Sequence, residues 1–369
     1  RFVTGEAIEL RGVTKTFPGA AAPAVAPLDL TFGAGEVTVL IGPSGCGKTT
    51  TLRMINRLVA PTAGTIAIGG VDVTERPLTD LRRGIGYVIQ QIGLFPHRTV
   101  AQNIATVPTL LRWDRARTRA RTEELADLVG IDHELLGRYP AELSGGQQQR
   151  VGVARAPAAD PPVLLMDEPF GAVDPIVRGR LQAELRALQD RVHKTIALVT
   201  HDLDEAIALG DRVAVLNVGG IVEQFAPPDE LLAAPANDFV ADFLGRERSI
   251  RRLALGHVRD LALDGGPVVD VDASPEEVAA ALRRSGSGWL GLIDGGRFLG
   301  WVPAGDLDGA PLRHLHPQPP AATVAAGSTM REALEVILTA RSSTAVVLDE
   351  AGAYAGTVTL ESIRRGLDR

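Results

Sequence analysis

Cysteine is almost absent from this sequence, since Cys46 is the only one among 369 residues. No disulfide can form within such a chain, and nothing in it indicates an oxidising compartment. Long apolar runs are lacking as well: no stretch approaches the roughly 18 uninterrupted apolar residues of a membrane-spanning helix. We therefore expect a cytosolic chain that does not itself cross a membrane.

Charge of one sign is not in large excess either. The formal net charge is -7, with 22% charged and 45% hydrophobic residues, as in ordinary soluble proteins. This balance argues against nucleic-acid binding as the main function, so we expect no nucleic-acid partner. The length of 369 residues favours two folded domains, each large enough to bury a core.

Short apolar runs and helical patterns alternate through the first two thirds of the chain. The apolar runs are bounded by turn or polar residues, as is typical of buried strands, and lie at 36–41, 65–68, 85–89, 163–166 and 195–199. Helical patterns are found at 49–58, 115–129 and 176–191, and a further helix opens near Ser144. This alternation predicts an α/β domain with a mainly parallel sheet.

The composition changes near the charged segment 245–252, after which lysine is absent and Gly and Ala are dense. We place the domain boundary there, with a first domain at 6–244, a linker at 245–255 and a second domain at 256–369. The second domain contains a weak internal repeat, with copies at about 256–310 and 318–366. Each copy predicts a helix followed by two short strands.

A glycine-rich loop directly follows the predicted strand 36–41. Its residues fit the pattern G-x-x-x-x-G-K-[ST] and are Gly42, Pro43, Ser44, Gly45, Cys46, Gly47, Lys48 and Thr49, with Thr50 after them. Backbone N–H groups at a helix N-terminus bind phosphate. Lys48 is expected to reach the β- and γ-phosphates of ATP, the Thr49 hydroxyl to bind Mg²⁺, and Cys46 to be an incidental loop residue. A chance match in a Gly-rich chain is the alternative, but the loop lies between a predicted strand and a predicted helix.

Two adjacent acids end the predicted strand 163–166. Asp167 is suited to holding Mg²⁺ through water and Glu168 to polarising the attacking water. Acids after a strand often mark only the start of a helix. Together with the glycine-rich loop, however, they predict a site for ATP hydrolysis.

The run Leu-Ser-Gly-Gly-Gln-Gln-Gln-Arg at 143–150 resembles the signature sequence of the ABC ATPase family. Ser144 would cap a helix and, with Gly145, Gly146 and Gln147, form an anion site. The resemblance implies that this site faces the γ-phosphate of ATP bound to a second copy, in a head-to-tail dimer that sandwiches two nucleotides. It also implies an ABC ATPase fold, in which an antiparallel β subdomain and a helical subdomain accompany the parallel sheet.

Four further residues match this family's motifs: Gln90 its glutamine loop, Asp174 its D-loop, His201 its switch histidine and Phe17 the aromatic that stacks on adenine. The resemblance implies that Gln90 senses Mg²⁺ and the γ-phosphate. It implies that His201 positions the γ-phosphate and the attacking water. Taken alone, a histidine after a strand is more often structural, and Phe17 could equally be a core aromatic.

One position departs from the pattern. Pro157 stands where the helix after the signature should continue, and proline removes a helical hydrogen bond and clashes with the preceding turn. We expect this helix to end or kink there.

Within the family, the segments 85–97 and 167–176 resemble those of osmoprotectant importers, whose solutes are glycine betaine, carnitine, choline and proline betaine. The resemblance covers 6–244 and implies separate membrane permease subunits that dock near 90–100, where Leu94, Phe95 and Pro96 suit such a contact. It also implies an extracytoplasmic substrate-binding protein and a peripheral location on the cytoplasmic face of the membrane.

The second domain resembles a tandem pair of CBS modules, a smaller α+β regulatory fold. Nucleotide-binding CBS pairs place Thr and Asp after the last strand. Here Pro303 replaces Thr before Asp306, while Thr359 is kept and Ser362 replaces Asp. Each copy keeps half of the pattern, so nucleotide binding is not favoured. Ionic-strength sensing, cyclic dinucleotide binding and dimerisation stay open.

Three other functions are consistent with parts of the sequence: an ABC importer ATPase for another small solute, a soluble ABC ATPase of translation or DNA repair, and a CBS module that binds nucleotide without turnover. The soluble ATPases usually carry two ATPase domains or a long coiled coil, and this chain has neither. Glu168 and His201 fill both hydrolytic positions, which argues against the third function.

Overall fold

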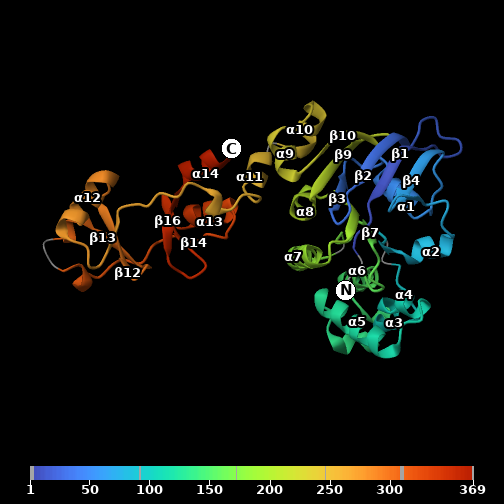
Figure 1. Ribbon diagram of the computed structural model, residues 1–369, viewed down its shortest axis with the longest axis horizontal. Coiled ribbons are helices and arrows are strands. Elements are labelled where there is room, and N and C mark those ends of the chain that lie inside the picture. The colour runs from blue at the N-terminus through green and yellow to red at the C-terminus, as the bar shows by residue number, and fades with distance from the viewer. Residues whose placement is uncertain (1–3, 91–92, 172, 246, 308–310, 368–369) are drawn as a thin grey trace. The chain divides into compact units, whose positions relative to one another are not determined.

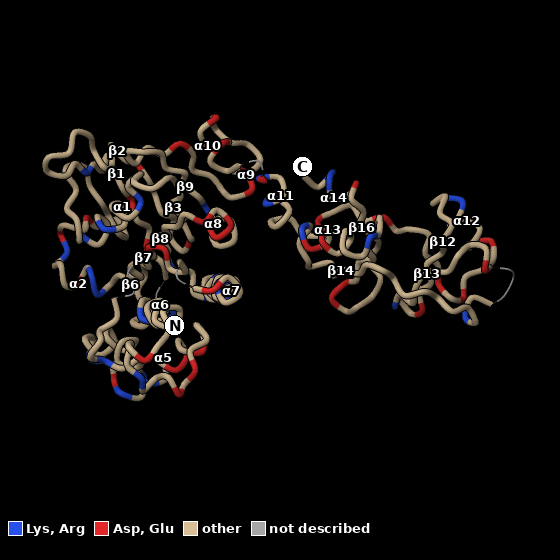
Figure 2. The backbone as a smooth tube through the Cα atoms, turned by 180° about the vertical axis from the view of Figure 1, so that it is seen from behind, with Lys and Arg blue, Asp and Glu red and all other residues tan. Residues whose placement is uncertain are grey.

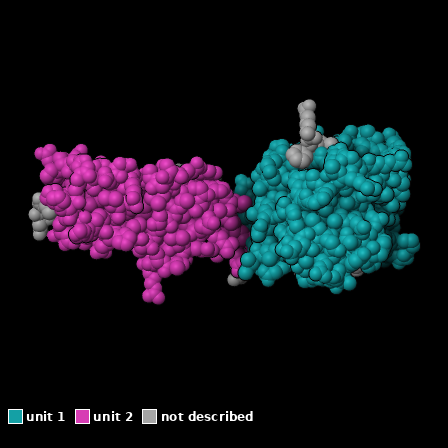
Figure 3. All heavy atoms as spheres, turned by 90° about the horizontal axis from the view of Figure 1, so that it is seen from below, with its two compact units in different colours: residues 1–245 teal, residues 246–369 magenta. Residues whose placement is uncertain are grey.

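The computed structural model describes residues 4–90, 93–171, 173–245, 247–307 and 311–367. The chain divides into two units, Arg1–Gly245 and Arg246–Arg369 (Figure 3). Within the segment predicted to be a linker, the structure has a short helix, α11 (Arg248–Arg252). Gln91, Ile92 and Ala172, which belong to the motif segments above, lie outside the described residues.

A six-stranded sheet forms the centre of the first unit (Figure 1). Its strands, in spatial order, are β10 (Ile221–Ala226), β9 (Arg212–Asn217), β3 (Val37–Ile41), β8 (Thr195–Val199), β7 (Val163–Asp167) and β6 (Ile85–Val88). All neighbours pair in parallel except β9 and β10. Every residue of β3, β7 and β8 is buried, as the uninterrupted apolar runs require of strands covered on both faces. The predicted mainly parallel sheet is confirmed.

A second, antiparallel sheet lies beside the first and has the order β2-β1-β4-β5. Its strands are β1 (Ile8–Lys15), β2 (Val25–Phe32), β4 (Ala63–Ile68) and β5 (Val71–Asp72). In β2 the buried positions alternate with exposed ones, because one face of an antiparallel sheet meets the core and the other meets solvent. Its buried side chains share one core with those of β3, β7 and β8.

Helices surround the parallel sheet, and a group of them forms a separate helical part below it in Figure 1. The helices of this unit are α1 (Lys48–Ile55), α2 (Leu78–Arg83), α3 (Val100–Ile104), α4 (Thr106–Leu110), α5 (Arg115–Leu128), α6 (Gly145–Arg155), α7 (Pro175–Val192), α8 (Leu203–Leu209), α9 (Pro228–Ala233) and α10 (Asp238–Leu244). Helix α5 carries its arginines in the first half and its glutamates in the second (Figure 2), and Arg119 pairs with Glu123 at 2.8 Å. The helix predicted at 49–58 ends earlier, at Ile55, because Arg57 adopts a left-handed φ of 55°.

Helix α6 ends at Arg155, two residues before Pro157. The chain then continues in turns, in which the backbone N–H of Asp160 donates to the Pro157 carbonyl at 3.0 Å. Proline has no N–H with which to extend the helical ladder, so the helix ends there, as the sequence predicted. The carbonyl of Pro157 also accepts from Nη2 of Arg121 on α5 at 3.1 Å, which fixes this turn against the helical part.

The second unit consists of two small sheets with the same topology. In each sheet, the first strand pairs in parallel with the second, and the second pairs antiparallel with the third. A helix connects the first strand to the second. The first sheet contains β11 (Val268–Asp270), β12 (Trp289–Asp294) and β13 (Arg297–Pro303), with α12 (Pro275–Ser285); the second contains β14 (Thr323–Ala325), β15 (Thr344–Leu348) and β16 (Tyr354–Thr359), with α13 (Met330–Thr339) and then α14 (Leu360–Leu367). Each sheet has its own apolar core.

The close packing of β6 against the end of α6 generates a testable prediction. A Cβ atom at Gly86 would lie 2.4 Å from the Ala156 carbonyl oxygen and 2.4 Å from Cδ2 of Leu164. Gly86→Ala therefore has to displace one of these elements, and we predict a loss of about 1–3 kcal/mol of unfolding free energy. At Gly137, a Cβ meets no described atom within 4 Å. Thermal unfolding of Gly137→Ala should match the parent chain, and equal midpoints for the two variants would contradict this account.

Candidate functional site

The glycine-rich loop connects the end of β3 to the start of α1. Gly42 and Gly47 have φ values of 150° and 98°, which side chains other than glycine rarely adopt. A Cβ at Gly42 would lie 2.1 Å from the Leu216 carbonyl oxygen of β9. The loop thus follows a path that requires glycine, and it ends at the N-terminus of α1, where free backbone N–H groups favour an anion.

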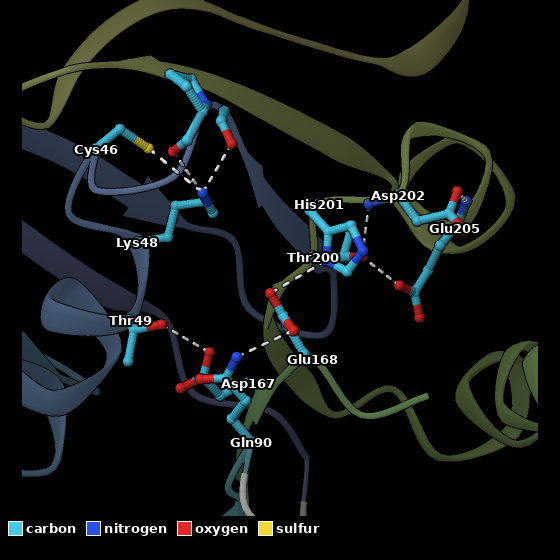
Figure 4. Close-up of polar contacts among 12 residues, drawn as sticks. Cys46, Lys48, Thr49, Gln90, Asp167, Glu168, Thr200, His201, Asp202 and Glu205 are labelled. Carbon is cyan, nitrogen blue, oxygen red and sulfur yellow. Dashed lines mark hydrogen bonds and ion pairs between the residues drawn. The ribbon is translucent and has the colours of Figure 1, made fainter. Parts of the chain in front are cut away.

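Lys48 is the first residue of α1, and its side chain lies within the curve of the loop (Figure 4). Its Nζ donates to the carbonyl oxygens of Gly42 at 2.8 Å and Pro43 at 3.0 Å. Cys46, predicted to be an incidental loop residue, is fully buried, and its Sγ lies 3.5 Å from the same ammonium. The loop backbone therefore holds the ammonium at the place where phosphate would bind.

Thr49 and Asp167 are 118 residues apart in sequence but are joined by a hydrogen bond. The Thr49 hydroxyl donates to Oδ1 of Asp167 at 2.9 Å (Figure 4). Asp167 is only 1% exposed, and its Oδ2 has no hydrogen-bond partner among the described residues. Burial raises the pKa of Asp167, because a buried carboxylate is costly without a compensating charge. A hydroxyl beside an unsatisfied carboxylate oxygen is a donor set that fits Mg²⁺.

Glu168 lies between Gln90 and His201 (Figure 4). Nε2 of Gln90 donates to one of its carboxylate oxygens at 3.1 Å, and Nδ1 of His201 lies 3.1 Å from the other. The backbone of Glu168 has a φ of 50°, a conformation that costs free energy for a residue with a side chain. The three side chains come from the ends of β6, β7 and β8, which are neighbours in the sheet.

Gln149 of α6 contacts the backbone of Glu168, which the sequence did not predict. Its Nε2 donates to the carbonyl oxygen of Glu168 at 3.1 Å, and its side chain is buried. Gln149 lies within the run 143–150, so its position there was the only available signal. The hydrogen bond connects the helix that Ser144 begins to the backbone of the acidic pair.

Ser144 is the N-cap of α6 and forms a capping box with Gln147. Its hydroxyl accepts from the Gln147 N–H at 3.3 Å, and its own N–H donates to Oε1 of Gln147 at 2.8 Å. Within the described chain, neither residue hydrogen-bonds to the group around the glycine-rich loop, and the same holds for Gly145, Gly146 and Asp174. Phe17 is 41% exposed, which argues against its being a core aromatic, and Nζ of Lys15 lies 5.1 Å from its ring centroid.

Comparison with known proteins gives matches along most of the chain. Residues 25–171 match the family model of the ABC transporter, and residues 312–369 match that of the CBS domain. The osmoprotectant import ATP-binding protein OsmV of Salmonella typhimurium is 46% identical over 366 residues, which cover 96% of this chain and 95% of that protein. The glycine betaine/carnitine/choline transport ATP-binding protein OpuCA of Bacillus subtilis is 44% identical over 362 residues, again covering 96% and 95%. A dimeric structure of the bacterial ABC transporter cassette MJ0796 is 34% identical with a TM-score of 0.56, and the match covers 60% of this chain and 98% of that one.

The chain belongs to the ATP-binding proteins of the osmoprotectant ABC importers. The resemblance at 143–150 and the predicted ABC ATPase fold with a C-terminal CBS domain are thereby confirmed. Its first unit is the nucleotide-binding cassette. No helix in the described part of this importer ATPase is long and apolar enough to cross a membrane.

A groove of about 280 Å³ lies next to β6 in the cassette. Phe95 lines it and is 40% exposed, while Arg155 closes one side by donating from Nη1 to the Gly93 carbonyl at 2.8 Å. The guanidinium carbon of Arg98 also lies 4.9 Å from the Phe95 ring centroid. The groove therefore combines an exposed aromatic with fixed positive charge beside β6, the strand that precedes Gln90.

The buried carboxyl group of Glu205 stabilises the loop that carries His201. The Thr200 hydroxyl donates to Glu205, which is 5% exposed, and accepts from the Asp202 N–H at 3.0 Å (Figure 4). Burial raises the pKa of Glu205. Asp202 in turn caps α8 by accepting from the N–H groups of Asp204 and Glu205. These contacts leave the His201 backbone few alternative conformations.

Arg178 of α7 joins this histidine loop to the segment that contains Asp174. Its Nη1 donates to Oδ2 of Asp202 at 3.2 Å, and its Nη2 donates to the Val173 carbonyl at 3.2 Å. One guanidinium thus fixes both loops, because its planar donors can satisfy two acceptors at once. This bridge could not be predicted from the sequence.

We predict that Arg178→Ala lowers the kcat of ATP hydrolysis about 10- to 100-fold, since a small displacement of a catalytic group has effects of this size. The KM for ATP should change little, because Arg178 does not contact the glycine-rich loop. Steady-state kinetics, with thermal unfolding to monitor the fold, would measure both. Arg180→Ala is the matched control: Arg180 lies on the same helix, is 71% exposed and pairs with Glu184 at 2.8 Å. A shared loss in both variants would refute a specific bridging role.

Proposed function

We propose that this importer ATPase hydrolyses Mg-ATP with Glu168 as the residue that polarises the attacking water. The observation that carries the proposal is the position of Glu168. Its carboxylate lies 3.1 Å from both Gln90 and His201, one residue after the Asp167 that accepts from Thr49. A carboxylate held by a donor on each side suits a base that has to act in a fixed geometry.

Thr49, Asp167 and Gln90 are the residues that we expect to hold Mg²⁺, with Asp167 acting through water. When bound, the ion neutralises charge on the β- and γ-phosphates. The unpartnered Oδ2 of Asp167 supports this assignment, since a buried carboxylate oxygen is stabilised by a cation. Lys48, with the loop from Gly42 to Thr50, binds the phosphates.

His201 is proposed to position the γ-phosphate and the attacking water. Its side chain is 69% exposed, so the ring is accessible to a nucleotide bound at the loop. Phe17 is proposed to stack on the adenine, for which its exposed ring is suitable. We therefore assign ATP binding to the loop from Gly42 to Thr50 with Phe17, and turnover to Glu168 and His201.

The functional unit is proposed to be a head-to-tail dimer of two copies. Ser144, Gly145 and Gly146 make no hydrogen bond to the glycine-rich loop within the described chain, yet they form a helix N-terminus suited to an anion. In the proposed dimer they face the γ-phosphate bound to the other copy, together with Gln147, and Asp174 lies near the interface. A dimeric cassette is known for MJ0796, which supports this arrangement.

The groove lined by Phe95 and Arg155 is the proposed docking place for membrane permease subunits. An exposed aromatic beside arginine is typical of the centre of a protein interface. The importer ATPase would then lie on the cytoplasmic face of the membrane, and the permease would receive solute from an extracytoplasmic binding protein. Gln90 follows β6, whose residues line this groove, and is therefore suited to transmit the state of the nucleotide.

The solute is proposed to be a quaternary amine of the betaine, carnitine or choline type. Relatives that match 96% of this chain include proteins named for the transport of these compounds. An importer for another small solute remains the alternative.

The tail, with proposed repeats at 256–310 and 318–366 after a boundary at 245–255, is assigned a regulatory role.

We predict that Glu168→Gln lowers ATP turnover by about 10²- to 10⁴-fold, as expected for loss of a positioned base. ATP binding should persist, because the loop and Lys48 are unchanged, and the trapped nucleotide should favour the dimer. Phosphate release and size-exclusion chromatography with Mg-ATP would measure these effects. Glu134→Gln changes an exposed carboxylate that is not part of the candidate site, and this variant should behave like the parent. Unchanged hydrolysis in Glu168→Gln would refute the assignment.

The solute class is tested by transport. Proteoliposomes that contain this ATPase and the permease subunits with which it assembles should accumulate radiolabelled glycine betaine when given Mg-ATP and the binding protein. The same vesicles made with Glu168→Gln should not accumulate it, because transport requires turnover. Hydrolysis coupled to uptake of an unrelated solute would exclude quaternary amines, and hydrolysis that no permease stimulates would favour a soluble ATPase.

A further inference from the structure

The tail contains a pocket of about 1000 Å³ that the function above does not use. Its walls come from both small sheets of the second unit and from the loops that precede their first strands. The lining includes both tryptophans of the tail, Trp289 and Trp301. The sequence contains only three tryptophans in all, so this concentration distinguishes the pocket from the rest of the surface.

Strand register brings the two tryptophans to one face of the sheet β11-β12-β13. Trp289 pairs with Pro303 and Gly291 pairs with Trp301, so both rings project from the same face as diagonal neighbours. The opposite face carries Leu290 and Leu292, which are fully buried in the core under α12. Apolar packing therefore fixes which face the tryptophans occupy.

Trp301 is held in place from several sides. A Cβ at Gly291 would lie 3.1 Å from Cζ3 of Trp301, so glycine leaves room for the ring on that strand. The Phe298 ring meets Trp301 edge-on at 5.1 Å and stacks on Tyr354 of the other sheet at 5.3 Å. The backbone of Trp301 also exchanges two 2.8 Å hydrogen bonds with Gln318. Contacts within the chain therefore preorganise this aromatic wall of the pocket.

The charges that line the pocket are balanced. Among the described lining residues, Arg284 and Asp264 carry the only formal charges, one of each sign. The remaining polar lining includes the amide of Gln318 and a set of hydroxyl groups. These hydroxyl groups belong to Ser285, Ser287, Ser342, Ser343, Thr344, Thr357 and Thr359. A nucleoside polyphosphate would place several negative charges against a single arginine, whereas a zwitterion matches this lining.

We propose that this pocket binds a compact quaternary ammonium zwitterion, the same class of compound that the importer carries. Quaternary ammonium groups bind to tryptophan faces through cation–π attraction, which assigns the cationic end to Trp289 and Trp301. Arg284, in the last turn of α12, is the partner for the carboxylate. This inference rests on the proposed function for the identity of the solute. It gives the tail a direct measure of solute that has already entered the cell.

Isothermal titration calorimetry of the full chain with glycine betaine tests the proposal. We expect saturable binding with a dissociation constant on the order of 1 mM, a plausible affinity for so small a ligand. Trp289→Leu and Arg284→Ala should each weaken binding about tenfold. Arg283→Ala is the matched control, because Arg283 is the adjacent exposed residue of α12 but does not line the pocket.

Choline, which lacks the carboxylate, provides a second test. It should bind more weakly than glycine betaine to the parent chain, and Arg284→Ala should remove that difference. Absence of saturable betaine binding, equal losses in Arg283→Ala and Arg284→Ala, or binding of AMP in place of betaine would each overturn the proposal. The titration needs no permease, so a negative result here, together with betaine uptake in proteoliposomes, would refute only this inference and not the proposed function.

Discussion

The burial of three neighbouring parallel strands is the constraint on which the nucleotide site depends. Every residue of β3, β8 and β7 is buried, so their register is fixed by apolar packing on both faces. Parallel strands end at the same edge of a sheet, and the segments that carry Lys48, Asp167 and His201 all begin there. Polar groups that are distant in sequence are thus brought together by hydrophobic side chains that never contact a ligand.

Local signals in the sequence predicted the parts of this site that are formed by consecutive residues. The loop from Gly42 to Thr49 and the acids after β7 could be recognised, because phosphate binding requires glycine and a helix N-terminus in one short segment. The hydrogen bond between Thr49 and Asp167 was not predicted, although the sequence assigned both residues to Mg²⁺. Its existence depends on strand order, in which β8 lies between β3 and β7.

The contacts that the sequence did not predict arise from helix orientation. Gln149 reaches the Glu168 carbonyl, and Arg178 reaches both Asp202 and the Val173 carbonyl, because α6 and α7 present these positions to the sheet edge. Glutamine and arginine on a helix are most often solvated, so these contacts could not be predicted from residue type. In the tail, the spacing of the repeats predicted helices and strands. The common face of Trp289 and Trp301, in contrast, depends on the irregular pairing between β12 and β13.

Two features of the site are unfavourable for folding and are explained by ligand binding. Asp167 is buried with one oxygen unpartnered, and Glu168 has a left-handed backbone conformation. Since the folded-state pKa of Asp167 is raised, the folded chain binds a proton there more tightly than the unfolded chain does. The associated stability is present at low pH and is lost as the pH rises through the folded-state pKa. A raised pKa means that ionisation of Asp167 costs stability in the folded chain, and a divalent cation is well suited to offset that cost. Any ligand that binds only the folded cassette recovers part of this lost stability.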